Sequence, residues 1–212
     1  MLNTSFLKSA VSSLALAAAV TLAVAPSAYA KPKVGAPAPS FSGMTADGKT
    51  VSLDDLKGKT VVLEWTNKDC PYVRKHYGTE NMQTLQRESK SDHGVMWVSV
   101  ISSAPGTQGY LEPDEARANV SETKAAPDHV VLDSKGAVGR AYAAVTTPHM
   151  FIIDAEGTLR FMGGIDNMPS ADWGTVKGAK NYVRAALDDM SAGRDVAEAV
   201  TRPYGCSVKY GS

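Results

Sequence analysis

A strongly apolar segment that ends just before a cysteine and a proline constrains the fold of this chain more than any other feature. Residues 60–66, TVVLEWT, are typical of a largely buried strand. Pro71 suits the first position of a helix, because the N–H that it lacks would have no partner there. Cys70 therefore lies where a strand passes into a helix. Unpaired backbone N–H groups and the helix dipole favour a thiolate at that point.

The alternative for Cys70 is an ordinary buried sulfhydryl, since free cysteine often behaves as a small core residue. Nearby charges act in both directions. Lys68, Arg74 and Lys75 add positive charge that would favour the thiolate, whereas Asp69 opposes it.

Strand and helix patterns alternate along the rest of the chain. In order, the sequence predicts a hairpin at 41–53, a helix at 71–89 with a break at Gly78, a strand at 95–101, a helix at 114–124, a strand at 129–133, a short helix around 137–145 and two strands within 146–166. A final helix is indicated by apolar residues at 3.6-residue spacing: Val176, Ala179, Tyr182, Val183, Ala186, Leu187 and Met190. This order predicts an α/β sandwich around a mixed sheet over residues 31–193, followed by a polar tail over 194–212.

The N-terminus has the pattern of a secretory signal peptide. Lys8 precedes a small and apolar run, and Ala28 and Ala30 fit the small-x-small cleavage rule. A membrane anchor is the alternative, but the run breaks at Pro26, short of the ~20 apolar residues that a spanning helix needs. We therefore expect removal of residues 1–30 and export, with the periplasm as the favoured destination and no contact with the membrane after cleavage.

Composition narrows the class of partner. The chain carries 22 basic and 22 acidic residues, and removal of residues 1–30 takes away only Lys8, which leaves a net charge of −1. This balance does not indicate binding to nucleic acid or to a membrane surface. We expect no cofactor and no metal, because the sequence contains no CxxxC or HxxxH ligand spacing. Two cysteines in an exported chain mean one bridge or two free thiols.

The ordered set of features resembles the thioredoxin-fold redoxins, in the peroxiredoxin-like branch of alkyl hydroperoxide reductase and thiol-specific antioxidant proteins. The resemblance covers roughly residues 34–190 and depends on CPYV at a helix start, TTP at 146–148, FIIDAEGTL and the final helix. The ending GCSVKY is similar to the tail of a peroxiredoxin-like subgroup. The resemblance implies a thioredoxin-like sandwich in which Pro148 is cis and lies against a reactive Cys70.

Three positions depart from the patterns of these families. Val73 stands where a CxxC dithiol has its second cysteine, so Cys70 has no local partner thiol. Asn67 stands where peroxiredoxins have a threonine, and Pro148 stands where their arginine would precede FIID. Asn67, Arg74 and Arg140 are the candidates to replace part of the lost polar contacts.

Cys206 offers a second thiol on a tail that, if flexible, can reach Cys70. A sulfenic acid condenses readily with a thiol, so we expect Cys70 to attack a peroxide or a protein disulfide, Cys206 to resolve the product and an external thiol reductant to reset the pair. A purely structural bridge is the alternative, because closing a loop of about 135 residues would stabilise the fold by roughly 5 kcal/mol. A thioredoxin-type disulfide reductase, a copper-binding module using Cys70 with His149, and a non-catalytic module also remain open.

Further side chains near the thiol have candidate roles. Thr147 is expected to position substrate backbone by hydrogen bonding. His149 is a candidate for lowering the pKa of the thiol, although an ordinary core or edge histidine is the alternative. Glu64 is either a proton acceptor with a pKa raised by burial or an outward, paired carboxylate. His76 and His93 are interpreted as surface residues.

Overall fold

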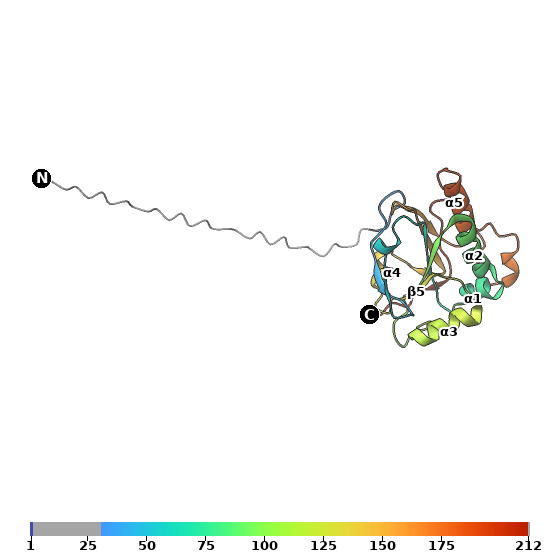
Figure 1. Ribbon diagram of the computed structural model, residues 1–212. Helices are drawn as coiled ribbons and strands as arrows, with labels where there is room; N and C mark the ends of the chain where they lie inside the picture. Colours follow the sequence, from blue (N-terminus) through green and yellow to red (C-terminus); the bar gives the residue numbers. More distant parts are fainter. Residues whose placement is uncertain (2–30, 212) are drawn as a thin grey trace.

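A mixed five-stranded sheet runs through the fold in the order β5-β4-β3-β7-β8 (Figure 1). The central strand β3 (Val61–Trp65) pairs in parallel with β4 (Met96–Ile101) and antiparallel with β7 (His149–Ile153). β5 (His129–Leu132) and β8 (Leu159–Gly163) lie at the two edges. The computed structural model describes Met1 and residues 31–211, so the predicted signal peptide, apart from Met1, lies outside the described residues.

The two faces of the sheet are separated by the alternation of side chains along β3. Val61, Leu63 and Trp65 pack into one core, whereas Val62 packs into the other. Each apolar side chain that is fully buried in this way contributes about 1.5–3 kcal/mol. This sandwich of helices and a mixed sheet is the predicted fold class, and it is confirmed.

Different elements cover each face. The first core lies under α4 (Ala137–Ala141) and the hairpin of β1 (Ser42–Met44) and β2 (Thr50–Ser52), with the short turn η1 (Asp54–Leu56). The second lies under α2 (Asn81–His93) and α5 (Tyr182–Ser191). Figure 1 shows α2 and α5 on the side of the sheet opposite to α4. The predicted hairpin is therefore confirmed, and it serves as a cover for one face of the sheet.

The helix that follows Cys70 breaks where the sequence predicts. It consists of α1 (Pro71–Gly78) and α2, separated by Thr79 and by Glu80, whose φ of 57° lies in the left-handed region. Gly78 lies against the exposed Trp173 ring, and a Cβ there would have to displace that ring, since it would lie 2.2 Å from it. The helix α3 (Pro113–Thr123) also forms as expected and begins at a capping box of Glu112 and Glu115.

The final helix is shorter than its apolar pattern predicts. Residues Trp173–Val176 form the separate 3₁₀ turn η2, and α5 begins only at Tyr182. Gly178 has a φ of +85°, which no right-handed helix contains, and the Asn181 side chain caps α5 by accepting from the Arg184 N–H at 2.9 Å. Val176 and Ala179 therefore lie outside the helix. Similarly, α4 ends before Ala143, whose φ is 48°.

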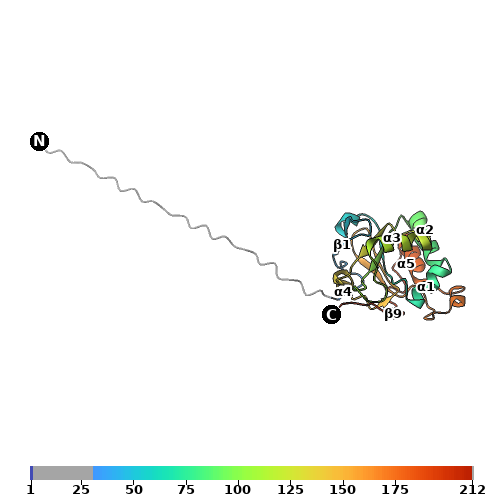
Figure 2. The same ribbon diagram turned by 90° about the horizontal axis from the view of Figure 1, so that it is seen from below.

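The described part of the polar tail, residues 194–211, is packed against the rest of the fold. Beside β8 the tail exchanges backbone hydrogen bonds with Met162, through Ala199 O (3.0 Å) and the Thr201 N–H (3.1 Å). Cys206–Ser207 then form β9, which pairs antiparallel with β6 (Thr146–Thr147). The described end of the chain lies next to α4 (Figure 2), where Arg140 donates to Gly211 O at 2.7 Å.

Passage of the tail over β8 requires a glycine in that strand. A Cβ on Gly163 would lie 2.1 Å from the Thr201 hydroxyl and 2.6 Å from the Thr201 carbonyl oxygen. We expect Gly163→Ala to lower the free energy of unfolding by about 2–4 kcal/mol, because it adds an overpacked contact to an unfavourable φ. Gly178→Ala is the matched control: its φ is also positive but no atom lies within 4 Å of the added Cβ, so about 1 kcal/mol is expected. Urea denaturation measures both, and equal losses would show that the tail is not packed against β8.

Candidate active site

Cys70 follows β3 and forms the N-cap of α1, as the sequence predicts. Its backbone is extended, with φ −76° and ψ 122°, and Pro71 occupies the first helical position. The Thr147–Pro148 peptide bond is cis, and the Thr147 carbonyl accepts a hydrogen bond from Cys70 Sγ at 3.1 Å. The thiol therefore lies against the segment that leads into β7.

Cys206 reaches the same point from the tail. In the β6–β9 ladder Cys206 is the direct partner of Thr147, whose carbonyl accepts from Cys70 Sγ, and the Cys206 thiol lies near enough to Cys70 to lower the pKa of that thiol. Gly205 makes this approach possible, since a Cβ there would lie 2.0 Å from the Thr147 carbonyl oxygen. Both cysteines are free thiols, with Cys70 buried and Cys206 partly exposed. Two residues that are far apart in sequence are thus brought together by strand pairing.

The environment favours one thiolate and one thiol. Burial raises the pKa of Cys70, but the Cys206 thiol, the N–H groups of Val73 and Cys206 and the Thr147 hydroxyl outweigh it, so the net shift is downward. The Val73 N–H contributes to the lowered pKa of Cys70, although the Cys70 side chain makes no regular N-cap hydrogen bond to α1. Burial and the contact with Cys70 raise the pKa of Cys206 to about 11. Cys70 is therefore the thiol that ionises more readily, and the Cys206 thiol is the hydrogen-bond donor of the pair.

Asn67 shapes the loop before the thiol. Its backbone carbonyl accepts the Cys70 N–H at 3.0 Å, its Oδ1 accepts the Asp69 N–H at 2.9 Å, and its Nδ2 donates to Gln108 O at 3.2 Å. Gly109 lets Asn67 pack this closely, because a Cβ there would lie 2.3 Å from the amide. These contacts make Asn67 a support for the position of Cys70.

Glu64 is buried rather than outward. Its carboxylate accepts hydrogen bonds from four side chains: Tyr77 (2.8 Å), Trp97 (2.9 Å), Ser99 (3.1 Å) and Gln86 (3.3 Å). Burial raises the pKa of Glu64 and outweighs these four hydrogen bonds, which lower it. Both oxygens are occupied by partners other than Cys70, so the contacts connect α1 and α2 to the sheet.

Three other candidates are held by different contacts. The His149 ring lies 4.4 Å from the Phe151 ring, and burial lowers the pKa of His149 to about 4. His149 is therefore neutral at pH 7 and adds no positive charge beside the thiol. Arg140 is committed to the tail, through Gly211 and through the Tyr210 ring 4.8 Å from its guanidinium. Arg74 is an exposed residue of α1 whose backbone N–H donates to Cys70 O at 2.8 Å.

The interpretation of His76 as a surface residue is wrong. Its side chain and that of Lys75 are 0% exposed and lie under the tail. The spacing of α1 contains the signal, because His76 is three positions from Val73 and adjacent to Tyr77, the positions that face the fold. His93 is 17% exposed, and its Nε2 lies 3.4 Å from Asp188.

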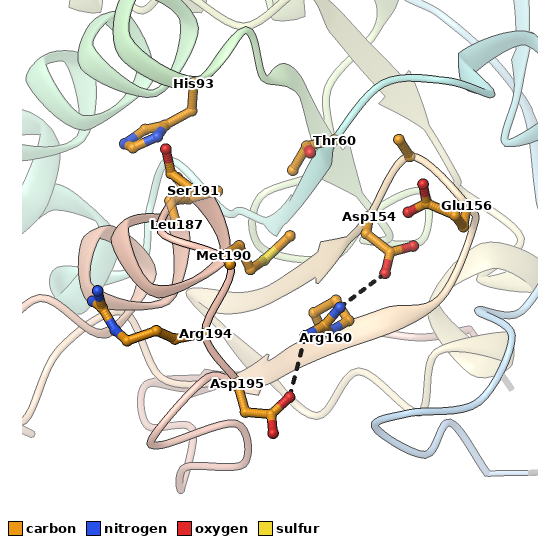
Figure 3. A pocket seen from close by; sticks show the side chains of 12 residues that line it. Thr60, His93, Asp154, Glu156, Arg160, Leu187, Met190, Ser191, Arg194 and Asp195 are labelled. Atoms are coloured by element: carbon orange, nitrogen blue, oxygen red, sulfur yellow. Dashed lines mark hydrogen bonds and ion pairs between the residues drawn. The ribbon is translucent and has the colours of Figure 1, made fainter.

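A separate cavity of about 340 Å³ lies at the opposite end of β3 from Cys70 (Figure 3). Its lining includes Thr60, which precedes β3, whereas Cys70 follows that strand. Arg160 in its wall is already paired with Asp154 at 3.3 Å and with Asp195 at 3.7 Å. The paired thiols, and not this cavity, are therefore the candidate site.

Within residues 31–211 no helix is long and apolar enough to cross a membrane, and no three His, Cys, Asp or Glu side chains gather in a metal-binding group.

The sheet order and the cysteine at the start of α1 define a thioredoxin-fold redoxin. Residues 34–162 match the model of the AhpC/TSA family, and the chain belongs to that family. It is 28% identical over 136 residues to the thioredoxin-like protein YneN of Bacillus subtilis, covering 62% of this chain and 74% of that protein.

Two solved structures share the fold. An uncharacterized conserved protein from Geobacillus kaustophilus superposes with a TM-score of 0.73 at 25% identity, over 84% of this chain and 93% of that one. A putative thiol:disulfide interchange protein DsbE from Chlorobium tepidum gives a TM-score of 0.54 at 24% identity, over 74% and 99%. These likenesses agree with the thioredoxin-like fold described above.

We expect the thiol of Cys206 to be needed for the low pKa of Cys70. Cys206→Ala removes the donor, whereas Cys206→Ser retains a hydroxyl that can donate in its place. The pKa of Cys70 should therefore be higher in the alanine variant than in the serine variant. Thiolate ultraviolet absorbance against pH measures it in both single-cysteine proteins. Identical titrations would show that the two side chains do not interact.

Glu64 makes the stability of the fold dependent on pH. Because burial raises the pKa of Glu64 in the folded state above its ordinary 4.5, folding favours the protonated form, and that stabilisation is lost as pH rises through the folded-state pKa. Glu64→Gln mimics the protonated acid. The variant should therefore gain stability relative to wild type as pH rises above 4.5. Parallel curves of unfolding free energy against pH would contradict this.

Proposed function

We propose that this protein is an exported thiol-dependent oxidoreductase with peroxiredoxin-like activity. The observation that carries the proposal is the pairing of β9 with β6, which brings the partly exposed Cys206 to a buried Cys70 whose pKa is lowered. A thiolate beside a thiol that can donate a proton is the pair that sulfenic acid chemistry needs.

The reaction has three steps. The Cys70 thiolate attacks a peroxide oxygen, the O–O bond breaks, and after proton uptake the products are an alcohol or water and a Cys70 sulfenic acid. The Cys206 thiol then attacks that sulfur, which forms a Cys70–Cys206 disulfide and releases water. An external dithiol finally reduces the disulfide and becomes oxidised itself.

A small peroxide is favoured over a protein substrate by the burial of Cys70. The thiol is 0% exposed, and the free edge of β6 beside it is taken by the tail. A disulfide on a folded protein has access to the sulfur only when the tail is displaced, whereas a peroxide is little larger than water.

A second candidate is thiol–disulfide exchange on proteins, with Cys70 as the attacking thiolate and Cys206 as its partner. It is supported by the lowered pKa of Cys70, because the attacking group in exchange is the thiolate. The name of the Bacillus subtilis relative, thioredoxin-like protein, agrees with this. Export, from the pattern of residues 1–30, applies to both candidates.

Titration of free thiols in the reduced mature chain, residues 31–212, tests the proposal. One equivalent of hydrogen peroxide should consume both thiols, and proteolysis should yield a peptide pair linked through Cys70 and Cys206. Cys206→Ser should stop at the Cys70 sulfenic acid, which a dimedone probe captures.

The outcomes separate the candidates. If both thiols stay free after peroxide, the peroxidase scheme is wrong. If peroxide reacts slowly but a disulfide-bonded protein such as insulin is reduced at the expense of both thiols, the second candidate is correct.

A further inference from the structure

Two polar side chains occupy fully buried positions on α1, the helix that begins at Cys70. Lys75 and His76 are both 0% exposed. Charged or polar groups are expensive to bury unless their donors and acceptors are satisfied. The hydrogen-bond partners of Lys75 and His76 therefore show which segment this part of the helix binds.

Their common partner is a tyrosine of the tail. The Tyr204 hydroxyl lies 3.2 Å from His76 Nε2 and accepts from Lys75 Nζ at 3.4 Å. It donates its own proton to Asp166 Oδ1. A phenolic oxygen has one proton and two lone pairs, so these three contacts use its full capacity.

The protons of this network have one consistent arrangement. The Asn81 amide nitrogen lies 2.8 Å from His76 Nδ1, so Nδ1 accepts and Nε2 carries the proton that is donated to Tyr204. Burial lowers the pKa of His76 to about 3, which keeps the ring neutral. Lys75 also donates to Met168 O at 3.1 Å and lies 3.9 Å from Asp166 Oδ2. Tyr204 is therefore fixed in both position and orientation.

Tyr204 stands two residues before Cys206, and only Gly205 separates them. Gly205 passes directly over the Thr147 carbonyl, since a Cβ on it would lie 2.0 Å from that oxygen. On the other side, the Tyr204 ring meets the Tyr72 ring edge to face, with 5.8 Å between centroids, and Tyr72 belongs to the first turn of α1. The network thus attaches the strand that carries Cys206 to the helix that carries Cys70.

We propose that Lys75, His76, Asp166 and Tyr204, here called the tail clamp, are positioning residues that hold Cys206 against Cys70 and so set the rate and equilibrium of disulfide formation between them. The proposal rests on the proposed function in that it takes Cys206 as the partner thiol. Its physical basis is effective concentration: a held reactant avoids the entropy loss that a freely moving one must pay.

Equilibration in glutathione redox buffers tests the clamp without any peroxide. Tyr204→Phe keeps the ring and removes only the oxygen that the network converges on. We expect the effective concentration of Cys206 at Cys70 to fall at least about tenfold, read from the fraction of disulfide-linked protein by mass spectrometry.

Tyr142→Phe is the matched control. It also removes the hydroxyl of a buried tyrosine, which donates to Pro39 O at 2.7 Å, but it lies outside the tail. The disulfide equilibrium should stay within about twofold of wild type. An unchanged equilibrium in Tyr204→Phe, or an equal fall in the control, would overturn the proposal.

Kinetics after mixing with hydrogen peroxide provide a second readout. In Tyr204→Phe the formation of Cys70 sulfenic acid should keep its rate within about twofold, while the later disulfide step slows at least about tenfold and more sulfinic acid accumulates. A general loss of structure would instead slow both steps.

Two variants of His76, compared with each other, make the test independent of whether Tyr204→Phe folds. His76→Leu removes the donor to Tyr204, and His76→Gln retains an N–H that can donate in its place. Disulfide formation should be impaired by leucine and restored to within about threefold of wild type by glutamine. Equal behaviour of the two would contradict the clamp. A wild-type protein that forms no disulfide in any glutathione buffer would instead contradict the proposed function.

Discussion

The pairing of Cys206 with Thr147 in the β6–β9 ladder is the interaction on which the site depends. It puts the second thiol next to the first at the point where the chain passes through cis Pro148 into β7. It also accounts for Gly205, since any side chain there would strike the Thr147 carbonyl. A chain with no CxxC motif thereby acquires a thiol pair from a helix N-cap and a strand that are far apart in sequence.

The tail is attached on both sides of Cys206, and the attachments differ in kind. Before Cys206 it is held by the buried polar contacts of Tyr204 with α1 and Asp166. After Cys206 it is held by Tyr210, whose hydroxyl donates to Ala144 O at 2.7 Å and whose ring packs on Gly136 and Gly139. Buried polar networks are costly when half satisfied but fix a single geometry when complete. Residues that touch neither sulfur therefore help to fix the reactive geometry, in addition to Thr147, which contacts Cys70 directly.

The sequence predicts most of the fold because its buried strands carry strong apolar signals, as in residues 60–66. It also places Cys70 at the start of a helix, from Pro71 alone. The packing of the tail is the part of the fold that the sequence does not predict. Its composition is polar, and its few specific contacts each depend on a distant partner such as Gly163 or Thr147. The apolar spacing of Val176 and Ala179 misleads because Gly178 interrupts the helix locally. Burial of Glu64 and His76 likewise follows from tertiary hydrogen bonds that single-residue polarity does not reveal.

The central claim is that Cys206 is already docked beside Cys70 before any oxidation occurs. Amide hydrogen exchange of the reduced protein, followed by mass spectrometry of peptides that cover residues 199–211, tests it directly. The N–H groups of Thr201 and Val208 donate to Met162 O and Val145 O, both at 3.1 Å, so these peptides should exchange slowly in the reduced protein, with little further protection after oxidation. Rapid exchange in the reduced state and protection only after disulfide formation would contradict the account.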